Sequence, residues 1–182
     1  MLKFIFLKIS FLLTCNIYAS YIIIPMDEKQ KNHLKSYGIA YWTLEQDIDV
    51  SWLLNYRGGS FLIKYNNIIE KECLIRGVSY EIIADAQSNK ILIEISNLEK
   101  NQDVVKLEKA PKIAVYSPKS KQPWDDAVTL ALTYSEIPYD IIYDTEVINN
   151  ILPIYDWLHL HHEDFTGQYG KFYSVFKNTK WY

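Results

Sequence analysis

The chain has 182 residues, of which 49% are hydrophobic and 23% are charged, as in an ordinary globular protein. Its 19 Lys and Arg against 22 Asp and Glu give a formal net charge of -3, which argues against nucleic acid as the main partner. The length suits roughly one domain to one and a half, and nothing in the composition indicates disorder. We therefore expect a folded protein with a core of useful size.

The N-terminus has the pattern of an export signal. Lys3 and Lys8 supply a positive end, and the apolar stretch there is too short to span a bilayer as a stable helix. Ala19 is a small residue at which a signal peptidase could cut. We expect residues 1–19 to be removed, so that a periplasmic or secreted protein without a transmembrane helix begins near Ser20.

The two cysteines indicate no disulfide framework. Export would remove Cys15 and leave Cys73 with no partner in the chain, and the apolar Ile69 and Leu74 near it favour burial. Two other interpretations keep the N-terminus: an uncleaved membrane anchor, or a lipid anchor on Cys15. Thr14 disfavours the lipid anchor, because such signals usually have a smaller residue there.

The first half of the mature chain is predicted to be an N-terminal βα region over 20–97, followed by a polar linker over 98–111. β-branched and apolar runs predict strands over 21–24, 50–56 and 78–83. Apolar positions three and four apart predict helices after Asp27, over 66–76 with Gly77 as its C-terminal cap, and over 86–97. The first of these helices has its predicted apolar face at Leu34, Tyr37, Tyr41 and Leu44.

The second half, over 112–182, alternates more cleanly. Strands are predicted over 112–116, 139–143 and 155–161, with helices over 123–135 and 145–152. This alternation with short loops predicts an α/β fold with a doubly wound, mostly parallel sheet of the flavodoxin-like type. Because such sheets usually contain more strands, we expect the sheet to be incomplete and the region to be truncated at its C-terminus.

Open α/β sheets bind ligands beyond the carboxyl ends of their strands, and the loops predicted there hold the ligand-binding candidates. These candidates are Arg57, Ser60, Lys119, Lys121 and Trp124. The two glycines after Arg57 would let a ligand approach the backbone, and the two lysines before a helix start could meet an anion. A plain turn and a solvated loop are the favoured interpretations of these two segments.

The densest polar group lies at the end of the last predicted strand. His159 and His161 point to the same face of a strand and Glu163 follows, so a divalent-metal site is one hypothesis. Glu163 or Asp164 acting as an acid or base without a metal is a second. We favour a structural loop, because strand histidines facing a helix layer are more often core groups, and we expect no metal and no cofactor.

Four long motifs carry a resemblance to a known family. They are IPMD at 24–27, GIAYW at 38–42, WLLNYRGGSF at 52–61 and WLHLHHEDFTGQYG at 157–170. Over 24–182 the chain resembles an exported bacterial family commonly labelled asparagine synthetase B. The resemblance implies that the second half begins a class I glutamine amidotransferase-like, flavodoxin-type region, whose nucleophilic cysteine lies in a Gly-rich segment beyond residue 182.

No catalytic residue carries over from this resemblance. Leu2 follows Met1, where a glutamine-hydrolysing asparagine synthetase has a cysteine, and the sequence has no Ser-Gly-Gly-x-Asp-Ser loop for ATP.

Three classes of function remain open. We favour an exported, noncatalytic binding or interaction module, built on an amidotransferase-like scaffold, for an unknown small molecule or protein. The first alternative is an amidotransferase or other hydrolase whose nucleophile lies beyond residue 182. The second is a metal-dependent hydrolase centred on the segment from His159 to Asp164.

Overall fold

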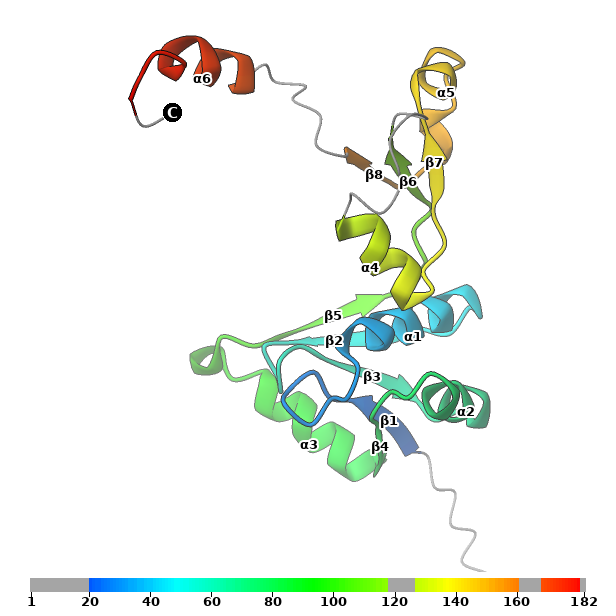
Figure 1. Ribbon diagram of the computed structural model, residues 1–182. Coiled ribbons are helices and arrows are strands. Elements are labelled where there is room, and N and C mark those ends of the chain that lie inside the picture. The colour runs from blue at the N-terminus through cyan, green and yellow to red at the C-terminus, as the bar shows by residue number, and fades with distance from the viewer. Residues whose placement is uncertain (1–19, 118–126, 161–167, 181–182) are drawn as a thin grey trace, which may run out of the picture.

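The computed structural model describes residues 20–117, 127–160 and 168–180, which form two α/β units and a separate C-terminal helix (Figure 1). The first unit is built on a five-stranded sheet in the order β4-β1-β3-β2-β5. Its strands are β1 (Ser20–Ile24), β2 (Val50–Leu54), β3 (Ser60–Lys64), β4 (Glu81–Ala84) and β5 (Asp103–Leu107). Every neighbouring pair in this sheet is antiparallel.

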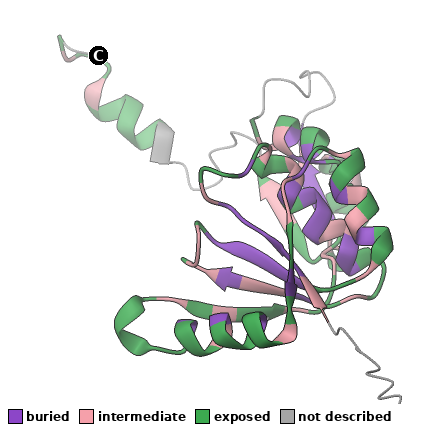
Figure 2. Cartoon of the chain, turned by 90° about the horizontal axis from the view of Figure 1, so that it is seen from below, coloured by how far each residue is buried: buried purple, intermediate pink, exposed green. Residues whose placement is uncertain are grey.

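Helices cover both faces of the five-stranded sheet. They are α1 (His33–Glu45), α2 (Asn67–Ile75), α3 (Asp85–Ile95) and the short 3-10 helix η1 (Leu98–Lys100). Successive strand residues point to opposite faces, so Ile22 and Ile24 pack with α1 and α2, whereas Ile23 packs with α3. The buried central strands in Figure 2 follow from this three-layer arrangement.

Local signals in the sequence set the helix ends of the first unit. The Asn32 side chain accepts a hydrogen bond from the Lys35 N–H at 3.1 Å, and the Asn66 side chain accepts one from the Ile68 N–H at 2.8 Å. Gly77 follows α2 with a φ of 68°, a left-handed conformation that glycine adopts at low cost. The predicted start and end of the second helix are confirmed.

The second unit is built on a three-stranded parallel sheet in the order β7-β6-β8. Its elements are β6 (Ile113–Tyr116), α4 (Ala127–Ser135), β7 (Asp140–Ile142), α5 (Asp144–Ile148), the 3-10 helix η3 (Leu152–Ile154) and β8 (Trp157–Leu160). Ile113 and Val115 of β6 pack against Leu132 of α4. The last helix, α6 (Gln168–Phe176), stands apart from both units (Figure 1).

The prediction of one doubly wound, mostly parallel sheet of the flavodoxin-like or amidotransferase-like type is wrong. The larger sheet is wholly antiparallel, and only the smaller one is parallel. The physical reason is that two strands were not predicted. β3 lies between β1 and β2 and forms a hairpin with β2, and β5, within the expected linker, pairs with β2 along its other edge.

Helix α1 is covered on two sides, by the five-stranded sheet and by α4. Its buried residues are Ser36, Gly38, Ile39, Ala40, Thr43 and Leu44. Leu34 and Tyr37, two members of the predicted apolar face, are instead 43% and 40% exposed. The single-face pattern was misleading because small residues such as Gly38 face a helix rather than solvent.

Contacts between α1 and α4 join the two units. A Cβ built on Gly38 would lie 1.8 Å from the Ser135 carbonyl oxygen, so the two backbones are in close contact. Glu136, just after α4, forms ion pairs with Lys35 and, at 3.2 Å, with Arg76. Close backbone packing between α1 and α4 and the ion pairs of Glu136 therefore hold the two units together.

Candidate functional site

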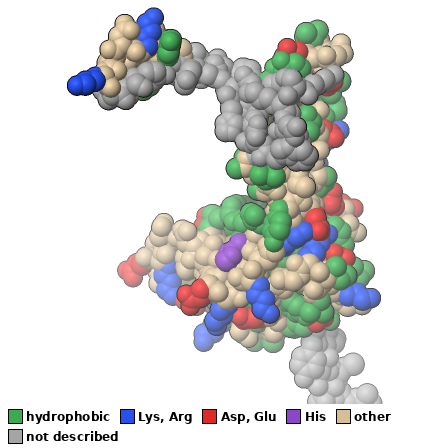
Figure 3. All heavy atoms as spheres, in the orientation of Figure 1, with side chains coloured by type: hydrophobic (Ala, Val, Ile, Leu, Met, Phe, Trp, Pro, Cys, Tyr) green, Lys and Arg blue, Asp and Glu red, His purple; other side chains and the backbone are tan. Residues whose placement is uncertain are grey.

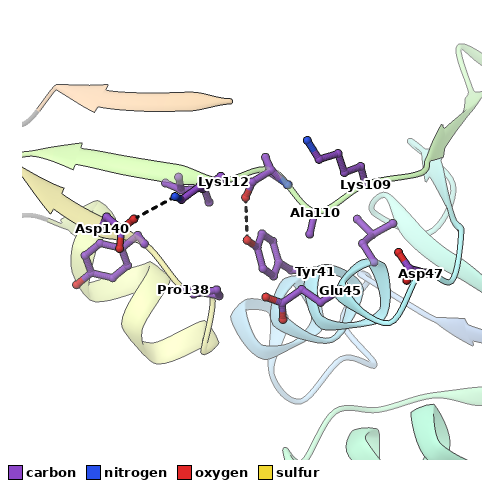
Figure 4. A pocket seen from close by; sticks show the side chains of 12 residues that line it. Tyr41, Glu45, Asp47, Lys109, Ala110, Lys112, Pro138 and Asp140 are labelled. Carbon is purple, nitrogen blue, oxygen red and sulfur yellow. Dashed lines mark hydrogen bonds and ion pairs between the residues drawn. The ribbon is translucent and has the colours of Figure 1, made fainter. Parts of the chain in front are cut away.

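The candidate site is a groove of about 540 Å³ where the two units meet, which we call the junction groove (Figure 4). It is lined by Tyr41, Leu44, Glu45, Asp47, Lys109, Ala110, Pro111, Lys112, Ile113, Pro138, Tyr139 and Asp140. One wall is the C-terminal half of α1, and the other is formed by the segments that lead into β6 and β7. The groove thus lies at the amino edge of the parallel sheet.

Two prolines and a left-handed residue set the course of the chain around the groove. Glu136 follows α4 with a φ of 60°, which ends the helix, and Pro138 cannot continue it. Pro111 likewise lies just before β6 and keeps the chain extended there. Both segments therefore line the groove outside regular helix and strand.

Tyr41 ties α1 to the segment that enters β6. Its hydroxyl donates a hydrogen bond to the Pro111 carbonyl oxygen at 2.7 Å. Burial, and then the negative charges of Glu45 and Asp156, raise the pKa of Tyr41 above its usual value. The phenol therefore stays neutral and keeps its proton as the donor in this contact.

The lysines of the groove already face carboxylates. The Lys112 ammonium lies 4.0 Å from an Asp140 oxygen and 4.9 Å from the centre of the Tyr155 ring, and the Tyr155 hydroxyl donates to Asp140 at 2.9 Å. Lys109 lies 3.5 Å from an Asp156 oxygen. Their positive charge is therefore largely balanced by the protein itself.

Glu45 and Asp47 give the groove an acidic rim beside α1. Both are exposed, and within the described part of the chain no ion pair joins either carboxylate to a cation. Figure 4 shows both side chains along the end of α1. Apolar and aromatic walls with an acidic rim suit a small polar molecule that carries a positive group.

Arg57 and Ser60, two predicted ligand-binding residues, hold the loop between β2 and β3. The Arg57 Nε donates to an Asp27 oxygen at 2.7 Å, and its Nη2 lies 3.0 Å from Glu81. The hydrogen bond from Arg57 is the main cause that lowers the pKa of Asp27. Ser60 is buried, and its hydroxyl donates to the Tyr56 carbonyl oxygen at 3.0 Å.

The glycines beside Arg57 also meet protein. Gly58 has a φ of 81°, and a Cβ there would lie 2.3 Å from the Met26 carbonyl oxygen. Trp52 donates its indole N–H to the Gly59 carbonyl oxygen at 3.0 Å. The close approach that these glycines permit is to the chain itself, which agrees with the favoured interpretation as a turn.

Of the other predicted site residues, His159 alone lies within the described residues. His159 is half-buried on β8, with its ring centre 6.4 Å from that of Trp157. The remaining candidates, Lys119, Lys121, Trp124, His161, Glu163 and Asp164, lie outside the described residues. Among the described residues, no three potential metal ligands come together.

The carboxyl ends of β6, β7 and β8 meet at one edge of the parallel sheet, as the register of Tyr116 with Ile142 and Leu160 requires. There the Tyr116 hydroxyl donates to Asp144 at 2.6 Å. The junction groove lies at the opposite edge and was not predicted. Its lining comes from three segments far apart in the chain, and no local motif marks them.

Cys73 is fully buried in α2. The pKa of its thiol is raised to about 12, chiefly by burial and also by the carboxylates of Glu70 and Glu72, against a smaller lowering by Arg76. The predicted burial is confirmed, and the neutral thiol is a poor nucleophile.

No protein-family model matches the chain, and searches of curated proteins and of solved structures returned no significant match. In the part of the chain that the structure describes, no helix combines the length and the apolar run that crossing a bilayer requires.

Proposed function

We propose that this protein is an exported binding module that takes a small amine-bearing molecule in the junction groove. The observation that carries the proposal is the groove itself, about 540 Å³ in volume, with apolar and aromatic walls and an acidic rim. This volume falls within the range of roughly 300–1,000 Å³ in which proteins usually bind small molecules.

The balance of charge supports an amine as the ligand group. Lys109 and Lys112 are balanced by Asp156 and Asp140, whereas Glu45 and Asp47 remain exposed at the rim. A bound ammonium would complete this charge pattern. The walls are also held in place before binding, because Tyr41 bonds to the opposite wall and α4 packs on α1, so little ordering is needed.

The test is a calorimetric titration of the purified chain with arginine, spermidine and, as an acidic counterpart, glutamate. We expect binding of the amines and weakened binding in a Glu45→Gln, Asp47→Asn double variant. A matched control is Glu28→Gln, Glu99→Gln, which removes two exposed carboxylates that do not line the groove. Equal binding by both double variants, or no heat with any amine, would refute the proposal.

Export is part of the proposal and has its own test. It is supported by the basic end, the apolar stretch and Ala19 in the sequence. Mass spectrometry of the protein expressed in a bacterial host should find a mature N-terminus close to Ser20. A soluble pool that keeps Met1 would contradict export and leave the groove proposal standing.

The burial of Cys73 supports a noncatalytic role over amide hydrolysis by this chain. Such hydrolysis needs an activated nucleophile with a base in reach, and the Cys73 thiol is inaccessible and protonated. Ammonia release from glutamine should therefore be the same for the parent and for Cys73→Ala. Turnover that disappears in the variant would restore an enzymatic function.

A further inference from the structure

Helix α6 separates apolar from basic side chains. At 3.6 residues per turn, Phe172, Tyr173, Val175 and Phe176 fall within an arc of about 160°. Lys171 lies about 40° beyond one end of this arc, and Lys177 lies about 40° beyond the other. Lys177 continues the helical turn, since its N–H donates to the Tyr173 carbonyl oxygen at 2.9 Å. Lysines thus flank the apolar side on both edges.

This apolar side faces solvent in the structure. Phe172 and Tyr173 are 44% and 48% exposed, and Val175 is 66% exposed. Figures 1 and 2 both show α6 set apart from the two sheets, and Figure 3 shows lysine side chains at that end of the molecule. Among the described residues, the buried clusters of the two units therefore include none of these aromatic residues of α6.

The C-terminal segment over 168–182, which contains α6, also differs in charge from the rest of the chain. Lys171, Lys177 and Lys180 are its charged residues, and no Asp or Glu follows Asp164. The segment over 168–182 thus has a formal charge of +3, and the rest of the chain has -6, the difference between -3 and +3. A basic, aromatic segment on an acidic protein favours an anionic surface as its partner.

We propose that α6 lies on an anionic lipid surface as an interfacial anchor. Aromatic side chains such as Phe172 and Phe176 favour the region between headgroups and acyl chains. Lysines at both edges of the apolar arc can extend their stems along that region and keep their ammonium groups at the lipid phosphates. This arrangement fits a plane that carries negative charge.

The size of α6 favours a lipid surface over a second copy of the chain. Nine helical residues span about 14 Å and present a strip about 10 Å wide. Such a strip is far smaller than the roughly 800 Å² per partner that a specific protein interface buries. A membrane requires no matching surface of that size, because charge and a few apolar side chains give reversible binding.

The test is co-sedimentation of the full chain with vesicles of phosphatidylcholine alone or mixed with phosphatidylglycerol. We expect binding to the anionic vesicles that weakens as salt is raised. A Lys171→Gln, Lys177→Gln variant should bind about 25-fold more weakly, since each lysine near an anionic surface is worth about fivefold. A Phe172→Ser, Phe176→Ser variant should lose the same binding.

The control variant Lys71→Gln, Lys90→Gln removes two exposed charges from α2 and α3 and should bind as the parent does. Because residues 1–19 are identical in all variants, their contribution cancels. Equal binding by the parent and both α6 variants would overturn the proposal. A second outcome would also overturn it. In that outcome neither the parent nor any variant binds lipid, and the parent self-associates in sedimentation velocity without vesicles, whereas the Phe172→Ser, Phe176→Ser variant does not.

Discussion

Replacing Gly38 by alanine tests whether α1 and α4 hold the two units together. The added Cβ would lie 1.8 Å from the Ser135 carbonyl oxygen, and ordinary contact begins near 3.4 Å, so α4 would have to retreat by about 1.6 Å. Overpacking of this kind costs about 1–3 kcal/mol, and a clash with backbone lies at the upper end. Alanine regains about 1 kcal/mol through its better helix propensity.

The net expectation for Gly38→Ala is a loss of about 2 kcal/mol in the free energy of unfolding, or about 4–8 °C in Tm for a chain of this size. Urea unfolding followed by circular dichroism measures this loss. Gly170→Ala is the matched control, because Gly170 lies in α6 and a Cβ there meets nothing within 4 Å. It should be neutral or slightly stabilising. A Gly38→Ala protein as stable as the parent would refute the reasoning about the contact.

Three further predictions concern the first unit. Asp27→Asn should destabilise the protein at pH 7, because the hydrogen bond from Arg57 lowers the pKa of Asp27 in the folded state. The stability that the ionised Asp27 contributes is present above its unfolded pKa of about 3.9 and is lost as the pH falls through its folded pKa. The free energies of unfolding of parent and variant, measured in urea, should therefore converge in acid. A difference between them that persists in acid would contradict the pairing. Gly58→Ala should lower the free energy of unfolding by about 1–3 kcal/mol in the same assay, because its φ of 81° is strained for alanine and its Cβ would meet the Met26 carbonyl oxygen at 2.3 Å. A variant as stable as the parent would show that the loop can move. Cys73 should react with a thiol reagent only at the rate of unfolding, since it is buried and its pKa is raised to about 12, and fast labelling of the native protein would disprove this.

The sequence signals were sufficient for the elements that have strong local patterns. The β-branched run of β1, the helix over 66–76 with Gly77 at its end, and the buried β6 were all predicted close to their observed places. β3 was missed because it begins directly after the two glycines of the loop, so the break concealed the strand. β5 was missed because Asp103 and Lys106 give it the polar character of an edge strand.

Missing these two strands changed the predicted fold, because strand direction depends on which strands are neighbours. With β3 and β5 absent, the remaining elements alternate as they do in a parallel sheet. The junction groove escaped prediction for a related reason. The docking of α4 on α1 brings together Glu45, Lys109 and Asp140. That docking depends on the small Gly38, and a glycine within a helical pattern does not by itself indicate a contact with another helix.

The position of α1 between the two units has a consequence for the order of assembly. All strand pairing of the antiparallel sheet is complete by Leu107, so the first unit can fold before β6 has left the ribosome. α4 then docks on a helix that is already held in place, across about 100 residues of sequence, as the pairing of Lys35 with Glu136 shows. The second unit is thus expected to mature late and to depend on the first as its template.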